Sequence, residues 1–211
     1  MHPTPSIIAF TTLSGLGFGL MAWLGVGDAA VGQLHALAIS TLAAGLAAAG
    51  LLASLLHLGQ PRRFLKAFSQ WRSSWLSREA ILAVATLLLF TLFAAVWGLL
   101  GIRSRWIGVP AGAAAMATVV ATSMIYAQLR SVPRWRSPLT PLLFLLPALA
   151  GGGLLAGEAR PAAWLLAAFG LVQVASWIRG DGSLARSGTT IATATGLGAL
   201  GRVRLFAPPH T

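Results

Sequence analysis

Residues 33–56 read QLHALAISTLAAGLAAAGLLASLL, a stretch without a single charged side chain. A helix needs about 20 apolar residues to cross the hydrocarbon core of a bilayer. A helix on the surface of a soluble domain would carry polar residues along one face. The stretch therefore predicts a transmembrane helix that contacts lipid or other helices on all sides.

The same pattern recurs along the whole chain. The composition is 56% hydrophobic and only 9% charged, which is outside the range of soluble globular domains. Long apolar runs occupy residues 7–26, 34–56, 80–101, 107–127, 138–156 and 162–178. We therefore expect an all-α membrane bundle of six transmembrane helices within residues 1–180. Residues 188–201 are too short and too weakly apolar to cross, so residues 181–211 should form a cytoplasmic loop or tail.

Basic residues are distributed unevenly between the expected loops. The net charge of +11 would suit a nucleic-acid partner, but the basic side chains lie between apolar runs and so belong to membrane topology. Twelve of the fifteen Lys and Arg residues follow the second, fourth or sixth run, and only Arg103, Arg105 and Arg160 lie elsewhere. The positive-inside rule places the 57–79 loop in the cytoplasm. We expect the N-terminus outside, with an uncleaved first helix because residues 1–5 carry no Lys or Arg.

The residue types limit the cofactors that this chain could hold. It has no cysteine, so we expect neither a thiolate metal site nor an iron–sulfur cluster of its own. His35 and His57 fall near opposite ends of one helix, about 33 Å apart at 1.5 Å per residue, while His2 and His210 are terminal. A haem held between two histidines is therefore not expected either.

The 57–79 loop combines aromatic and basic residues at helical spacing. Its aromatic residues are Phe64, Phe68, Trp71 and Trp75, and the basic residues between them are Arg62, Arg63, Lys66 and Arg72. The pattern predicts a short amphipathic helix over residues 61–76 that lies at the level of the lipid headgroups. Membrane anchoring explains the apolar face, and a partner-binding surface would need the same face.

Two proton-exchanging groups flank this loop. His57 ends one apolar run, and Glu79 falls in the first turn of the next, where Ser77 is a candidate N-cap. Favourable interaction with the helix dipole is a sufficient structural explanation for each residue alone. Adjacent antiparallel helices would nevertheless bring both to one membrane face, and ionisable groups at the edge of hydrocarbon are functional candidates. The pair suits a quinone site, since quinol oxidation requires a base beside the ring and a redox centre in a partner.

Two further features bear on the class of protein. Gly15 and Gly19 are four residues apart within an apolar run, which predicts a close approach between helices. No charged residue lies in the middle of any run, which makes a transporter or channel the least favoured alternative. A purely structural membrane anchor, in which His57 and Glu79 only stabilise helix ends, remains the main alternative to a quinone site.

Three stretches carry a resemblance to a known family. They are His57-Leu58-Gly59 with Pro61; Ser74, Leu76, Ser77 and Glu79; and residues 132–141, VPRWRSPLTP, preceded by Tyr126. With these motifs the chain resembles the membrane anchor subunits of dimethyl sulfoxide reductase and related molybdopterin oxidoreductases. His2-Pro3 and residues 11–15, TTLSG, are similar to the branch that is often paired with sulfite-oxidising cytoplasmic enzymes.

The resemblance implies a quinone-reactive, or simply non-catalytic, subunit of an inner-membrane oxidoreductase complex. Such a subunit anchors a molybdopterin catalytic subunit and an iron–sulfur subunit, and exchanges their electrons with ubiquinone or menaquinone between His57 and Glu79. The candidates for the quinone pocket are Phe64, Phe68, Trp71, Arg72, Trp75 and Ser77. The candidates for docking the iron–sulfur subunit are Arg62, Arg63, Lys66, Arg130, Arg134 and Arg136. Members of this family usually have eight transmembrane helices, so we expect either a missing last pair or a chain truncated before it.

Overall fold

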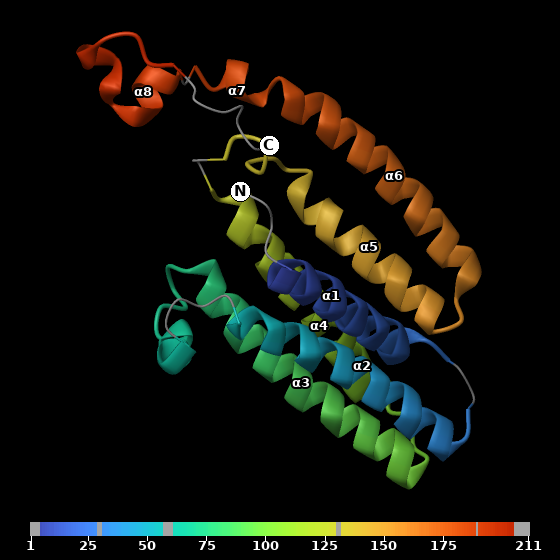
Figure 1. Cartoon of the computed structure of the whole chain (residues 1–211). Helices are drawn as coiled ribbons and strands as arrows, with labels where there is room; N and C mark the ends of the chain where they lie inside the picture. Colours follow the sequence, from blue (N-terminus) through green and yellow to red (C-terminus); the bar gives the residue numbers. More distant parts are fainter. Residues whose placement is uncertain (1–4, 29–30, 57–60, 130–131, 189, 205–211) are drawn as a thin grey trace.

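The computed structural model describes residues 5–28, 31–56, 61–129, 132–188 and 190–204. Six antiparallel helices make up most of it: α1 (Pro5–Val26), α2 (Gln33–Leu55), α3 (Trp75–Leu100), α4 (Arg105–Ala127), α5 (Thr140–Leu155) and α6 (Ala159–Asp181). A 3₁₀ helix, η1 (Pro61–Phe68), precedes α3, and the short elements α7 (Ser183–Arg186), α8 (Ile191–Thr195) and η2 (Leu197–Leu200) follow α6. In Figure 1 these last elements extend beyond the end of the bundle.

Five of these helices, all except α5, are long and apolar enough to cross a membrane. The expected all-α membrane bundle is therefore confirmed for five helices, but the run predicted over residues 138–156 yields only the 16-residue α5. Pro138 disfavours helical backbone at the preceding Ser137, and α5 begins at Thr140 with Pro141 in its first turn. Helix α5 ends at Leu155, two residues before Gly157, whose left-handed conformation (φ +83°) is typical of a helix end.

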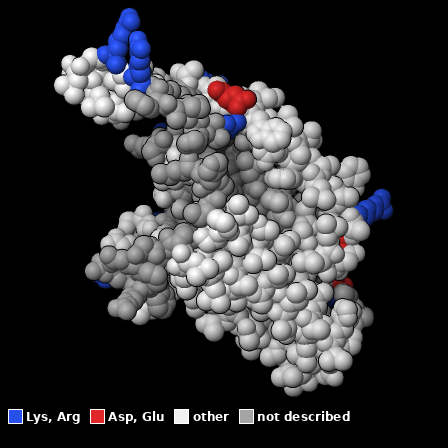
Figure 2. Space-filling view, in the orientation of Figure 1, with Lys and Arg blue, Asp and Glu red and all other residues white. Residues whose placement is uncertain are grey.

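Helix α1 occupies the centre of the bundle. It packs against α2, α4 and α5, whereas α6 packs mainly on α5 and lies at the outer edge (Figure 1). The core combines many buried alanines with a few large apolar side chains, among which Phe18, Met21, Phe90 and Phe93 are almost fully buried. Figure 2 shows long uncharged flanks with charged side chains gathered toward the ends of the helices, as a bilayer requires.

The start of α1 lies at the same end of the bundle as the segment between α2 and α3. Phe10 near the start of α1, Leu55 at the end of α2 and Leu76 at the start of α3 line one cavity. The prediction that the N-terminus lies on the opposite side of the membrane from the 57–79 loop is therefore wrong. Helices α1 and α2 are antiparallel, so together they return the chain to its starting side.

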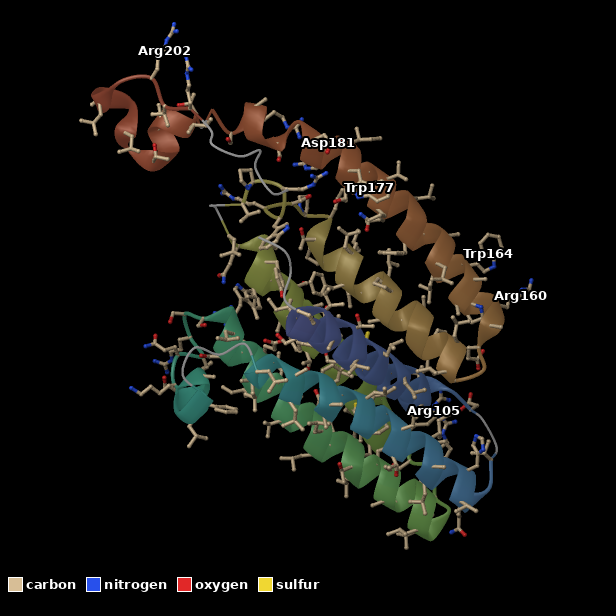
Figure 3. The ribbon with its side chains drawn as sticks, viewed as in Figure 1. Arg105, Arg160, Trp164, Trp177, Asp181 and Arg202 are labelled. Carbon is tan, nitrogen blue, oxygen red and sulfur yellow. The ribbon has the colours of Figure 1, made fainter. Side chains whose placement is uncertain are left out.

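We call this the basic end of the bundle, because the Lys and Arg residues that the structure describes within residues 61–78, 132–136 and 179–204 lie here. The opposite, far end carries Arg103, Arg105 and Arg160. Figure 3 shows Arg160 at the far end of α6, and Asp181 at its basic end. Trp164 and Trp177 lie toward the two ends of the same helix, as aromatic residues do at the two membrane interfaces (Figure 3).

Small residues let α1 approach its neighbours closely. A Cβ atom at Gly19 would overlap the backbone of Ala148 on α5, and one at Gly17 would lie 2.8 Å from the carbonyl oxygen of Ala43 on α2. At Gly15 an added Cβ would meet the Cβ of Ala148 at 3.8 Å, an ordinary contact. The predicted close approach is confirmed at Gly19, and Gly17, between the two predicted positions, leaves no room for a Cβ either.

The segment before α3 differs from its prediction. The helix expected over residues 61–76 ends at Phe68, and α3 begins at Trp75. Serine hydroxyls stop the helix by bonding to local backbone, since Ser69 Oγ donates to the carbonyl oxygen of Lys66 at 2.8 Å. Arg78 then holds the following turn by donating to the carbonyl oxygens of Trp71 and Arg72 at 3.0 and 2.7 Å.

The N-cap of α3 is Ser74, with extended backbone angles of φ −113° and ψ 126° and without a side-chain capping bond. The prediction of Ser77 as N-cap is therefore wrong, and Ser77 is buried within the helix. Because α3 begins earlier than expected, Glu79 lies beyond its first turn rather than within it.

Candidate functional site

Glu79 is a buried carboxyl group at the basic end of the bundle, with only 4% of its surface exposed. Its side chain reaches α4, where the Thr122 hydroxyl donates a hydrogen bond to Glu79 Oε1 at 2.5 Å. The same hydroxyl lies 3.1 Å from the carbonyl oxygen of Thr118, one turn earlier on α4. The Glu79 carboxyl group is therefore held in one orientation by a bond between two helices.

Thr122 was not among the predicted site residues. The bond joins residues 43 positions apart, and threonine is common in membrane helices, so no local pattern marked it. The one available signal was Tyr126, which lies a helical turn after Thr122. Tyr126 packs edge-on against Trp135, with 5.4 Å between ring centroids, so the VPRWRSPLTP segment packs beside the same end of α4.

An apolar cavity of about 210 Å³ lies beside Glu79, between α1, α2, η1 and α3. Its walls include Phe10, Leu51, Leu55, Ala67, Phe68 and Leu76. Glu79 is its charged group, and Ser54 adds a hydroxyl that donates to the carbonyl oxygen of Leu51 at 2.6 Å. Leu52 and Val84 line the cavity and are also exposed on the outside of the bundle, so the cavity borders the lipid-facing surface.

Only some of the predicted pocket residues meet at this cavity. Phe68 and Glu79 line it. Trp71, Arg72 and Trp75 are not part of its wall and instead take part in contacts between aromatic rings and guanidinium groups. The Arg72 guanidinium lies 5.3 Å from the centre of the Trp71 ring, and that of Arg78 lies 4.4 Å from the Trp75 ring.

The remaining predicted pocket residues are placed as follows. Ser77 is buried in α3 but is not part of the cavity wall. The backbone of Phe64 forms part of η1. His57 lies outside the described residues, two positions after the end of α2 at Leu55.

The residues predicted to dock a partner are spread over the basic end. Lys66 is exposed on η1, whose backbone also includes Arg62 and Arg63. Arg134 and Arg136 lie in the segment before α5, and Arg130 is outside the described residues. Arg134 forms an ion pair with Asp181, at 2.6 Å between Nη2 and Oδ1.

The family profile of the DMSO reductase anchor subunit (DmsC) matches residues 4–174 of this chain. The chain belongs to this family. It is also 37% identical to a sulfite dehydrogenase subunit of Allochromatium vinosum, over 178 aligned residues that cover 74% of this chain and 54% of the relative. The chain therefore spans about half the length of that relative. No solved structure gives a significant match.

The resemblance seen in the sequence motifs is thus confirmed at the level of the family. A DmsC-type chain is a multi-pass membrane anchor subunit, which agrees with the five membrane-length helices of the bundle. The match includes the whole of the Glu79 cavity and the contact between α3 and α4. Within the described residues, no three His, Cys, Asp or Glu side chains gather as a metal site would require.

Proposed function

We propose that this chain anchors a molybdopterin oxidoreductase complex and exchanges its electrons with a quinone bound beside Glu79. The observation that carries the proposal is a buried carboxyl group in the wall of an apolar cavity that borders the lipid phase. A quinone reaches its site through the bilayer, so such a site needs an apolar opening toward lipid and a polar group for the ring oxygens. The Glu79 cavity combines both.

The size and lining of the cavity suit a single ring. A dry apolar cavity of about 150 Å³ holds a benzene molecule, and the Glu79 cavity measures about 210 Å³. Phe10 and Phe68 supply aromatic surface for the ring faces. The isoprenoid tail would leave between Leu52 and Val84, which are exposed to lipid.

The chemistry assigned to this chain is proton exchange. Quinol oxidation releases two protons and two electrons; Glu79 would take one proton at its carboxyl group, and His57 is the proposed second acceptor. Thr122 would hold the carboxyl group toward the cavity. The chain has no cysteine to bind an iron–sulfur cluster of its own, so the electrons would pass to or from a partner subunit.

The charge distribution supports the side on which that partner docks. In the sequence, twelve of the fifteen Lys and Arg residues follow the second, fourth or sixth apolar run, and the positive-inside rule therefore favours the cytoplasm for the basic end. Lys66 and Arg136 are exposed there and would contact an iron–sulfur subunit that connects to the molybdopterin subunit. Because a relative is a sulfite dehydrogenase subunit, we propose sulfite oxidation as the reaction of the complex, with reduction of dimethyl sulfoxide as the alternative.

A purely structural anchor is the second candidate. The bond between Thr122 and Glu79 favours it, since the same bond would fasten α3 to α4 without any ligand. The two candidates differ in whether the cavity binds a quinone at all.

Photolabelling with an azidoquinone tests the proposal without requiring turnover. We expect label on peptides from residues 51–84, displaced by unlabelled quinone and reduced by Glu79→Gln. Glu158→Gln at the far end makes the same chemical change on an exposed residue and should leave the labelling intact. Label that is spread evenly over the helices, or that Glu79→Gln does not change, would favour the structural anchor.

A further inference from the structure

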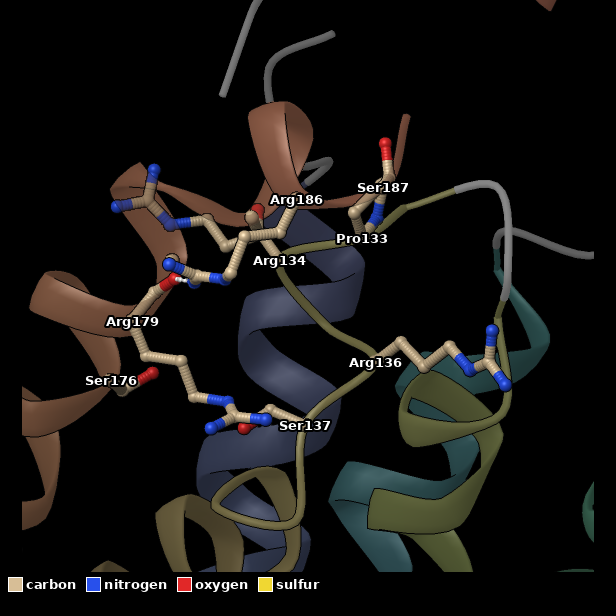
Figure 4. Close-up of a pocket in the computed structure, with 10 residues that line it drawn as sticks. Pro133, Arg134, Arg136, Ser137, Ser176, Arg179, Arg186 and Ser187 are labelled. Carbon is tan, nitrogen blue, oxygen red and sulfur yellow. Dashed lines mark hydrogen bonds between the residues drawn. The ribbon is translucent and has the colours of Figure 1, made fainter. Parts of the chain in front are cut away.

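A second site at the basic end concerns a different ligand. Three arginines, Arg134, Arg179 and Arg186, converge on a cavity of about 190 Å³ between the segment before α5 and the junction of α6 with α7. Ser137 and Ser176 add hydroxyl groups to its wall (Figure 4). Arg136 lines the same cavity, but its side chain is directed away from the other three in Figure 4. We call this cavity the arginine cradle.

The cradle has an excess of positive charge. Arg134 is paired with Asp181, at 2.6 Å. In the part of the chain that the structure describes, no carboxylate forms an ion pair with Arg179 or Arg186; Arg186 instead donates to the carbonyl oxygen of Arg179. Guanidinium groups that line one cavity repel one another unless an anion lies between them. The N–H groups of a planar guanidinium are spaced to donate two parallel hydrogen bonds to the oxygens of one phosphate.

An apolar groove continues from the cradle. A cavity of about 410 Å³ between α1, α5 and α6 shares Arg134 and Ser176 with the cradle, and its walls include Ile8, Phe144 and Trp177. A third cavity, of about 370 Å³, shares Phe144 and reaches Pro147 and Ala148 further along α5. The lining therefore changes from charged at the cradle to mainly apolar in the two cavities that lead to Ala148.

We propose that the cradle and groove bind an anionic glycerophospholipid, with its phosphate between Arg134, Arg179 and Arg186 and an acyl chain along α1 and α5. Basic pockets between membrane helices are general binding sites for anionic headgroups. The outer position of α6 supports lipid access, since only Ala162 and Gly180 are buried in this helix, and its outer side exposes large apolar side chains: Trp164, Leu166, Leu171 and Ile178. Trp177, exposed beside the groove, lies at the interfacial level where headgroups lie.

The combination of cradle and groove distinguishes this ligand from others. An acidic segment of a partner protein would satisfy the arginines but leave the apolar groove empty. A quinone would fill the groove but has no charge for three guanidinium groups. The groove also lies across α1 from the Glu79 cavity, because Ile8 and Thr11 line the groove and Phe10 lines the Glu79 cavity. The inference therefore does not depend on the proposed quinone site.

Native mass spectrometry of the purified, delipidated full chain in detergent tests the inference. Titration with phosphatidylglycerol and with phosphatidylcholine should show preferential binding of one phosphatidylglycerol. Basic residues at a membrane surface contribute about 1 kcal/mol each to such binding, which is roughly fivefold in affinity. The double variant Arg179→Gln/Arg186→Gln should therefore bind phosphatidylglycerol about 25-fold more weakly.

The matched control is Arg202→Gln/Arg204→Gln, which removes the same charge from an exposed segment outside the cradle. This variant should bind like the wild type. Arg179→Lys keeps the positive charge and should bind phosphatidylglycerol nearly as well as the wild type. Elution of each variant as a monodisperse species in size-exclusion chromatography shows that a loss of binding does not reflect misfolding.

Three results would overturn the inference. The first is equal binding of phosphatidylcholine and phosphatidylglycerol. The second is an equal loss in the Arg202→Gln/Arg204→Gln control, which would indicate a general charge effect. The third is displacement of the lipid by millimolar inorganic phosphate without a contribution from acyl chains, which would indicate a site for small anions.

Discussion

Replacement of Thr122 by valine isolates the hydrogen bond that orients Glu79. The substitution preserves the shape of the side chain and removes the hydroxyl that donates to Glu79 Oε1 at 2.5 Å. Hydrogen bonds to charged groups contribute about 1.5–3 kcal/mol. We take the lower value, because the Thr122 hydroxyl also lies within bonding distance of the Thr118 carbonyl oxygen.

A loss of about 1.5 kcal/mol corresponds to a roughly tenfold slower reaction. We therefore expect Thr122→Val to lower the kcat of quinone-linked electron transfer about tenfold per assembled complex. The KM for quinone should change by less than about threefold, since the apolar walls of the cavity are untouched. The assay is steady-state turnover of the purified complex, normalised to the amount of anchor subunit.

Thr86→Val is the matched control. Thr86 is fully buried in the same interface between α3 and α4, and its hydroxyl bonds to that of Thr118 at 3.0 Å without contacting Glu79. Hydrogen bonds between membrane helices contribute about 0.6–1.7 kcal/mol, so both variants should lose a similar, small amount of stability. Equal kinetic effects of the two variants would refute the assignment of Thr122 to the site, because they would reflect helix packing alone.

Two further predictions concern the stability of the bundle. Gly19→Leu should lower the free energy of unfolding by about 1–3 kcal/mol, because its Cβ would overlap the backbone of Ala148. A Cβ at the exposed Gly45 on α2 would meet no atom within 4 Å, so Gly45→Leu should be neutral. Unfolding in mixed micelles measures both, and equal losses would contradict the packing of α1 on α5. Arg103→Ala should lower stability by about 1.5–3 kcal/mol, since Arg103 donates to the carbonyl oxygen of Leu24 at 2.6 Å and lies 4.8 Å from the centre of the Trp97 ring. Arg105→Ala, at an exposed ion pair with Asp28 that spans 3.9 Å, should cost less than about 1 kcal/mol. Burial lowers the pKa of the Arg103 guanidinium below its usual range, and this loss of hydration opposes the stabilisation that its contacts provide.

Much of the fold followed from apolar periodicity and length. The helix predicted over residues 33–56 differs from α2 by one residue, because an uncharged run of membrane length is stable in a bilayer only as a helix. The prediction failed where short-range chemistry decided the boundary. Serines in the segment after Phe68 compete for backbone hydrogen bonds, and the prolines before α5 delay its start.

The candidate site was predictable only in part. Glu79 stood out in the sequence because a lone carboxyl group at the edge of an apolar run is unusual. Thr122 and Phe10 could not be predicted, since their approach to Glu79 depends on how α1 and α4 pack against α3. The prediction that put the N-terminus and the 57–79 loop on opposite sides of the membrane was wrong for a simpler reason, since two antiparallel helices always return the chain to its starting side.

The central claim is that Glu79 belongs to a working quinone site, and quinone-linked turnover of the complex carrying Glu79→Gln tests it most directly. Subunit stoichiometry and reduction of a soluble dye by the catalytic partner should be measured on the same sample, with Glu158→Gln as the control. The account predicts intact assembly and dye activity, with quinone turnover lower by at least about tenfold for Glu79→Gln and for His57→Ala. Unchanged quinone turnover in an intact Glu79→Gln complex would contradict this claim. The role of Glu79 would then be limited to the hydrogen bond that joins α3 to α4.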